Sequence, residues 1–321
     1  MIKIPKDNPL QILSIGTKIL LKDVMDQYLR SLGEVKTYYA SKMSIAVESY
    51  LEKRPNIIFC EHGFSEGSAL DFIQYIGGLD PSGDQYFVLA VEESSDPLVA
   101  LAVEKGIDEI LVKPFSIDTI HQIVERYLEK REMATEDWAK ELRNAKVSFL
   151  EKRFLEAEDL YANAARHYPA NISVLLECAD FFLRRGYANQ AQTLVAAVLK
   201  EAPMNVRALS IMGSALKKQG HYEEAASMFL KAHDLSPLNS LRNVELAETY
   251  VLMAEAQIQL ALKVETENST LILTKAKYQL LRRDYAALVN YLDAKRAFLN
   301  DAGKKEADNL TLLAKKLGGI R

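Results

Sequence analysis

The sequence predicts two folds in one chain: an α/β domain with a five-stranded parallel sheet, then an all-α array of helical hairpins. Short apolar runs alternate with segments of helical spacing in the first part of the chain. A repeat with a period of 34 residues follows in the second part. The 321 residues suffice for two hydrophobic cores. We therefore expect domains at residues 1–132 and 133–321.

Five apolar runs in the first part have the length and composition of buried strands. They are Gln11–Ile15, Val35–Tyr39, Ile57–Cys60, Tyr86–Val91 and Glu109–Val112. Segments with helical spacing separate them, such as the one that carries Leu21, Val24 and Tyr28. Strands that alternate with helices form a doubly wound parallel sheet covered on both faces. A site in this architecture lies at the carboxyl ends of the strands, beside the point where the strand order reverses.

Three stretches resemble the receiver domain of bacterial response regulators, over roughly residues 9–132. They are QILSIGTK, PNIIFCEHGFSEGSALDFIQYI and VEKGIDEILVKPFSIDTI. The third is close to the Lys-Pro-Phe stretch of that family. The resemblance implies a flavodoxin-like fold and a pocket in which a working receiver phosphorylates an aspartate with the help of Mg²⁺. It also implies a cis peptide before Pro114.

The same resemblance places six residues in that pocket. They are Gly16, Thr17, Glu61, Val91, Ile110 and Lys113. The family has, in this order, two acids that hold Mg²⁺, the phosphorylated aspartate, a hydroxyl residue, an aromatic switch residue and a lysine. Only the lysine is present here. Phosphoryl transfer depends on neutralisation of charge by metal and cation, so we expect a pseudo-receiver that binds no metal or cofactor.

Glu61 admits two interpretations. Its side chain is one methylene longer than that of aspartate, so its carboxylate could pair with Lys113 and hold the pocket in one conformation. Alternatively, a position freed from its chemistry has kept an acid because the end of a strand tolerates one.

The second part contains three segments that superpose without gaps: RFLEAEDLYANAARHYPAN, GYANQAQTLVAAVLKEAPMN and GHYEEAASMFLKAHDLSPLN. A small residue recurs 34 residues apart, as Ala157, Ala191 and Ala225. An apolar residue follows four positions later and a proline twelve positions later in each copy. These segments resemble tetratricopeptide repeats (TPRs). The pattern weakens after residue 239, where we expect further hairpins, four to five in all, and a capping helix.

The TPR resemblance implies a concave groove, lined by the first helix of each repeat, that takes an extended or helical peptide. The candidate groove residues are Leu142, Lys146, Phe149, Leu176, Asp180, Arg184, Arg207, Lys217 and Lys218. They grade from apolar to basic, which suits a protein partner with an apolar anchor and acidic residues. The alternative is that the two lysines are ordinary solvated charges beside a turn.

The remaining observations exclude several classes of function. Residues 1–130 carry 20 acids against 13 bases, a net charge of −7, which leaves +3 for residues 131–321. Neither part has the clustered basic face of a nucleic-acid-binding protein. The first residues do not have the pattern of an export signal and no apolar run reaches membrane-spanning length, so we expect neither an export signal nor a membrane span. The five histidines lack metal-ligand spacing, and no nucleotide-binding or nucleophile motif occurs.

We therefore expect a cytoplasmic, non-enzymatic signalling adaptor that binds another protein and contacts neither nucleic acid nor membrane. A homodimer is compatible with the sequence. The alternative is a switchable response regulator with atypical chemistry, whose receiver domain gates the TPR groove.

Overall fold

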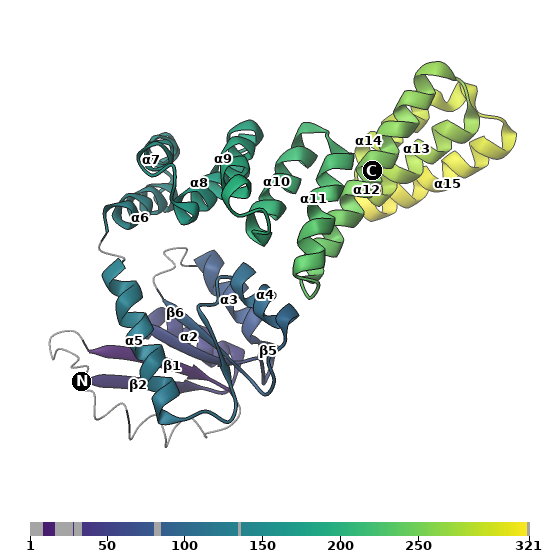
Figure 1. Cartoon of the computed structure of the whole chain (residues 1–321). Coiled ribbons are helices and arrows are strands. Elements are labelled where there is room, and N and C mark those ends of the chain that lie inside the picture. The colour runs from purple at the N-terminus through teal and green to yellow at the C-terminus, as the bar shows by residue number, and fades with distance from the viewer. Residues whose placement is uncertain (1–8, 17–27, 29–33, 80–84, 134–135, 320–321) are drawn as a thin grey trace. The chain divides into compact units, whose positions relative to one another are not determined.

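The computed structural model describes residues 9–16, 28, 34–79, 85–133 and 136–319 (Figure 1). The chain divides into two compact units, residues 1–208 with 234–238 and residues 209–233 with 239–321. The boundary that we expect between residues 132 and 133 falls inside the first unit, at the end of a helix. That domain boundary remains a prediction.

Five parallel strands form the sheet of the first unit. They are β1 (Leu10–Ile15), β2 (Val35–Ala40), β3 (Ile57–Glu61), β6 (Tyr86–Val91) and β7 (Glu109–Val112), in the order β2-β1-β3-β6-β7. This is the flavodoxin-like order of a doubly wound fold, so the predicted fold class is confirmed. Every residue of β3 and β6 is buried, as expected for central strands covered on both faces.

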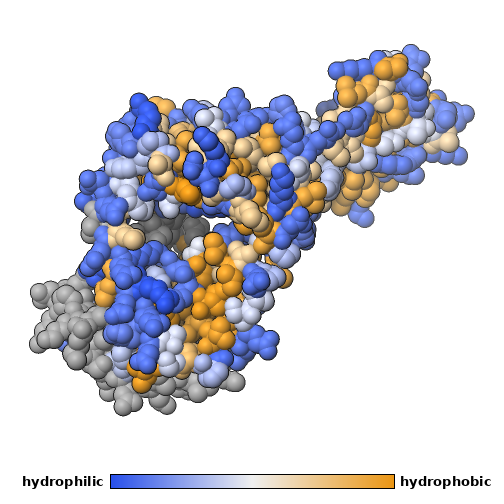
Figure 2. Space-filling view, viewed as in Figure 1, coloured by the Kyte–Doolittle hydropathy of each residue, from blue (hydrophilic) through white to orange (hydrophobic). Residues whose placement is uncertain are grey.

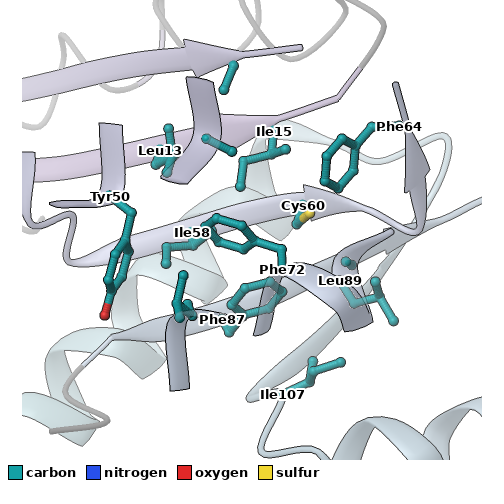
Figure 3. Close-up of a cluster of buried hydrophobic side chains, with 14 of the residues drawn as sticks. Leu13, Ile15, Tyr50, Ile58, Cys60, Phe64, Phe72, Phe87, Leu89 and Ile107 are labelled. Atoms are coloured by element: carbon teal, nitrogen blue, oxygen red, sulfur yellow. The ribbon is translucent and has the colours of Figure 1, made fainter. Parts of the chain in front are cut away.

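The alternating side chains of the strands build one core on each face of the sheet. Leu13 and Ile58 pack with Phe72 in one core, which also receives α2 (Met43–Lys53), α3 (Ala69–Leu79) and α4 (Asp96–Glu104). Figure 3 shows this cluster. The other core lies under α5 (Ile117–Met133). The helical segment predicted around Leu21 lies outside the described residues.

Three helical hairpins follow. They are α6 (Asp137–Leu150) with α7 (Phe154–His167), α8 (Ile172–Arg184) with α9 (Ala188–Glu201), and α10 (Val206–Gln219) with α11 (Tyr222–Leu235). The repeated alanines Ala157, Ala191 and Ala225 are all fully buried. A side chain larger than alanine there would force the paired helices apart, which is why the repeat keeps a small residue.

The repeat changes character in α12 (Ser240–Val264), which runs unbroken for 25 residues. The turn between paired helices has a left-handed backbone at Lys152, Gly186 and Gly220, with φ of 61°, 92° and 86°. The next position at the same spacing is Ala254, which lies inside α12. Alanine favours the helix and disfavours a left-handed turn, so the helix continues where a hairpin would otherwise form.

The chain ends in helices that pack into one core with α12. They are α13 (Ser269–Leu281), α14 (Tyr285–Lys295) and α15 (Asp301–Gly318), with a short 3₁₀ turn at Arg296–Phe298. No helix in the described part of the chain is both long enough and apolar enough to span a membrane. Figure 2 shows hydrophobic residues gathered on the α/β domain, between the positions that Figure 1 gives to α4 and α5. Val99 and Val103 of α4 and Val112 of β7 are exposed.

Candidate functional sites

An open pocket lies at the carboxyl ends of the central strands. Glu61 ends β3, Val91 ends β6, and Lys113 directly follows β7. The pocket is lined by Glu61, His62, Gly63, Ala90, Val91, Glu92, Glu93, Leu98 and Lys113. Its position is the one that the parallel sheet predicts for a site.

Two of the lining residues, Glu61 and Lys113, form an ion pair. Lys113 Nζ donates to Glu61 Oε1 at 2.6 Å, and the two side chains are only 20% and 7% exposed. The same ammonium lies 3.3 Å from Glu92, whose side chain is 77% exposed. Partial burial lowers the pKa of Lys113, but the hydrogen bonds and charges of Glu61 and then Glu92 outweigh it and raise the pKa above its usual value. The lysine is therefore held as a cation between two carboxylates.

Gly16 lies directly against Glu61. A Cβ atom at residue 16 would come within 2.5 Å of Glu61 Cδ and Oε2 and 2.6 Å of its Cγ. The glutamate carboxyl group thus fills space beside a bare backbone. Thr17, the other residue predicted at this place, lies outside the described residues.

Val91 and Ile110 both pack with the hydrophobic core of the α/β fold. Val91 lines the pocket and is 5% exposed, and its carbonyl accepts a hydrogen bond from the backbone of Lys113. Ile110 packs against the hydrophobic core and is not among the lining residues. The Lys113–Pro114 peptide is cis, as the resemblance implied.

The loop after Glu61 folds back as a two-stranded hairpin that the sequence did not reveal. Its strands are β4 (Gly63–Phe64) and β5 (Gly67–Ser68). Phe64 is buried in the same core as Ile15 and Cys60 (Figure 3). Glycines on either side of a buried aromatic residue are the signal that could have indicated this hairpin. The hairpin anchors the loop that forms one wall of the pocket.

The apolar candidates of the TPR groove are largely internal. Leu142 and Leu176 are 5% and 6% exposed. Phe149 is half-buried and packs edge-on against Phe181, with 5.5 Å between the ring centroids. These side chains contribute first to the core between helices.

The charged candidates in the first unit are paired within the chain. Glu177, which the sequence analysis did not single out, lies 3.2 Å from Lys146 and 2.7 Å from Arg207. Burial raises the pKa of Glu177, but Arg207 and then Lys146 outweigh it and hold the pKa below its usual value. Asp180 and Arg184 pair one turn apart on α8. A glutamate between two cations on neighbouring repeats is visible only in the folded chain.

The second unit contains the remaining two candidates. Lys217 Nζ lies 3.1 Å from Glu248 and 5.8 Å from the centre of the Phe229 ring. Lys218, the next residue on α10, is exposed. Arg242 is a further residue that the sequence analysis missed; it is 1% exposed and donates to the carbonyl of Ala232 at 2.6 Å.

Comparisons with known proteins agree with this division. Residues 148–214 match the family model described as tetratricopeptide repeat. A search of the curated proteins found no match. Among solved structures, the chain is similar to a two-component response regulator from Clostridium difficile, with 18% identity, 38% of this chain and 98% of that chain covered, and a TM-score of 0.35.

It is also similar to a CheY-like response regulator receiver domain protein from Methanospirillum hungatei, with 14% identity over 39% of this chain and 99% of that chain and a TM-score of 0.35. The non-phosphorylated HemR receiver domain from Leptospira biflexa matches with 18% identity over 37% of this chain and 94% of that chain and a TM-score of 0.34.

The strand order and the repeat match define the class. The chain joins a receiver-type α/β fold to tetratricopeptide repeats, as the sequence predicted. The family model covers residues 148–214 alone, and the similarity to the solved structures concerns the fold of the α/β domain.

Proposed function

We propose that the chain is a non-enzymatic signalling adaptor. Its TPR helices bind a protein partner, and its receiver-type domain does not undergo Mg²⁺-dependent phosphorylation of an aspartate. The observation that carries the proposal is the pairing of Lys113 with Glu61 at 2.6 Å in the pocket. The one family residue that would meet a phosphoryl group is engaged by the chain's own carboxylate.

The charge of the pocket supports the same conclusion. Glu61, Glu92 and Glu93 contribute three negative charges against the single positive charge of Lys113, a net of −2 with His62 neutral. Gly16 offers no carboxylate for a hard cation such as Mg²⁺. Without a bound cation, a pocket of this sign repels a phosphoryl group.

The first prediction follows from this pocket chemistry. Acetyl phosphate with Mg²⁺ leaves the intact mass of the full chain unchanged, and beryllofluoride does not shift its melting temperature. A working receiver domain treated in parallel is the positive control. A stoichiometric phosphate adduct on any pocket residue would refute the pseudo-receiver proposal and favour the switchable response regulator.

The TPR part supplies the proposed binding activity. Tetratricopeptide repeats generally form a concave face lined by the first helix of each repeat, and we propose that the partner binds there. Among the basic candidates, Lys146 and Arg207 pair with Glu177, and Lys217 pairs with Glu248, so an acidic group of the partner must exchange with these carboxylates. We propose a partner with an apolar anchor and acidic residues, an adaptor role in the cytoplasm, and no contact with nucleic acid or membrane.

A further inference from the structure

We infer that Gly16 and Glu61 form a steric interlock: the side chain of residue 61 fills the space that any side chain at residue 16 needs, and the bare backbone of Gly16 keeps the Glu61–Lys113 pair closed. This inference concerns how the vestigial pocket is held, and its functional meaning rests on the proposed pseudo-receiver. Gly16 is thus a positioning residue that acts through Glu61.

Glu61 is the nearest neighbour of Gly16 on the side where a Cβ atom would lie. The three heavy atoms nearest to a Cβ built on Gly16 all belong to Glu61, at 2.5, 2.5 and 2.6 Å. Real Cβ atoms do not approach other atoms this closely, so one of the two groups must move. The neighbour is the end of a flexible side chain, and Glu61 is the group that gives way.

The backbone of Gly16 does not itself require glycine. Its φ lies outside the left-handed region, unlike that of Gly106, Gly186 or Gly220. Alanine could adopt this conformation, and the backbone hydrogen bond from Gly16 to Ala40 at 3.0 Å would remain. Within the described part of the chain, the nearest obstacle to a side chain at residue 16 is therefore Glu61.

Movement of Glu61 breaks its pair with Lys113. Glu61 is 6% exposed and ends a fully buried strand, so its side chain has few other places to go and must turn out toward the open pocket. Lys113 would retain Glu92, whose exposed carboxylate holds a lysine only weakly. A methyl group at residue 16 therefore separates Lys113 from Glu61 and exposes the lysine in the pocket.

The interlock also links two departures from the receiver pattern. The missing acid at residue 16 and the longer acid at residue 61 are complementary in volume: one residue gives up the space that the other takes. Changing either residue alone leaves a clash or a void, and both cost stability.

The test is the rate at which an amine-reactive acylating reagent labels Lys113 in the full chain, measured by peptide mass spectrometry. In Gly16→Ala the rate rises about ten- to hundredfold, the factor that corresponds to loss of one charged hydrogen bond. Glu61→Ala gives a similar rise, and adding Gly16→Ala to it has no further effect. Gly213→Ala is the matched control, since a Cβ there would clash in the same way with Phe229, at 2.8 Å, in the repeat helices, and it leaves the rate unchanged.

Melting temperatures separate the steric cause from the electrostatic one. Gly16→Ala lowers the melting temperature in the Glu61 background and equally in the Glu61→Gln background, because the amide has the same volume. Gly16→Ala does not lower the melting temperature when residue 61 is alanine. Unchanged labelling of Lys113 in Gly16→Ala, or an equal loss of stability with alanine at residue 61, would overturn the interlock. Neither result changes the outcome of the phosphorylation test. Conversely, phosphorylation of the wild-type chain would refute the proposed function without changing the labelling rate of Lys113.

Discussion

At the scale of single residues, the turns between paired helices depend on one backbone conformation. Lys152 occupies the position that Gly186 and Gly220 hold in the next two repeats, and all three have positive φ. A residue with a Cβ atom pays roughly 1–2 kcal/mol for the left-handed conformation, which glycine adopts without strain. The lysine is exposed, so nothing that it contacts in the core offsets this cost.

We predict that Lys152→Gly stabilises the chain by about 0.5–1 kcal/mol, since the relief of backbone strain exceeds the extra entropy of glycine in the unfolded chain. Urea or thermal unfolding of the full chain measures the change. Gly186→Ala is the reciprocal control and lowers stability by a similar amount. A neutral or destabilising result for Lys152→Gly would show that the turn carries no strain.

At the scale of the elements, one partly buried carboxylate, that of Glu177, connects three helices through ion pairs. Glu177 of α8 receives Lys146 of α6 and Arg207 in the first turn of α10. Its side chain is 27% exposed, so these charges are only partly screened by solvent. Two of the candidate basic residues of the groove, Lys146 and Arg207, are therefore held by a carboxylate of the chain itself.

The lowered pKa of Glu177 predicts how stability depends on pH. Because its pKa is lower in the folded than in the unfolded chain, its contribution is complete above the ordinary glutamate value of about 4.3 and is lost as the pH falls through the folded-state pKa. Glu177→Gln lowers stability at pH 7 by about 1–3 kcal/mol, because it leaves two cations with a neutral partner. Because the glutamine side chain does not titrate, Glu177→Gln loses less stability than the wild-type chain as the pH falls.

Unfolding curves between pH 7 and pH 3 provide the measurement. Glu201→Gln, at an exposed glutamate in the last turn of α9, is the control and retains the wild-type pH profile. If Glu177→Gln and wild type lose stability in parallel below pH 5, the bridge does not contribute as proposed.

At the scale of the whole molecule, the proposed function depends on the binding of a partner by the TPR helices. Apolar contacts usually dominate the affinity of such grooves, while charges set association rate and specificity. Leu142 and Leu176 are buried between helices, so the half-exposed Phe149 is the better anchor for a ligand among the apolar candidates. Lys217 and Lys218 supply charge on α10 of the second unit.

We predict that the double variant Lys217→Glu, Lys218→Glu weakens binding of the partner captured by the full chain from its native cell. It also reduces the dependence of binding on salt, because a basic surface that attracts acidic groups is screened by ions. Lys231→Glu makes the same type of charge change on α11, the second helix of that repeat, and leaves binding unchanged. Equal affinities and equal salt dependence for wild type and the double variant would show that this part of α10 does not contribute to the binding site.

The sequence by itself determined the strands and the repeat, and it predicted three of the residues that line the pocket, Glu61, Val91 and Lys113. Apolar runs predict strands because central strands of a parallel sheet are buried on both faces, and a fixed 34-residue spacing predicts hairpins because each needs a small residue where its helices meet. One of the two interpretations of Glu61, that it pairs with Lys113, also came from residue types alone, and the contact at 2.6 Å agrees with it.

Only the tertiary structure decided which side chains compete for the same space or share the same charge. Gly16 and Glu61 are 45 residues apart in the chain and meet because β1 and β3 are neighbours in the sheet. Glu177 looked like an ordinary helical glutamate until folding brought cations from two other helices to it. Local periodicity records which face of an element is buried, whereas steric exclusion and ion pairing depend on the three-dimensional distances that folding sets.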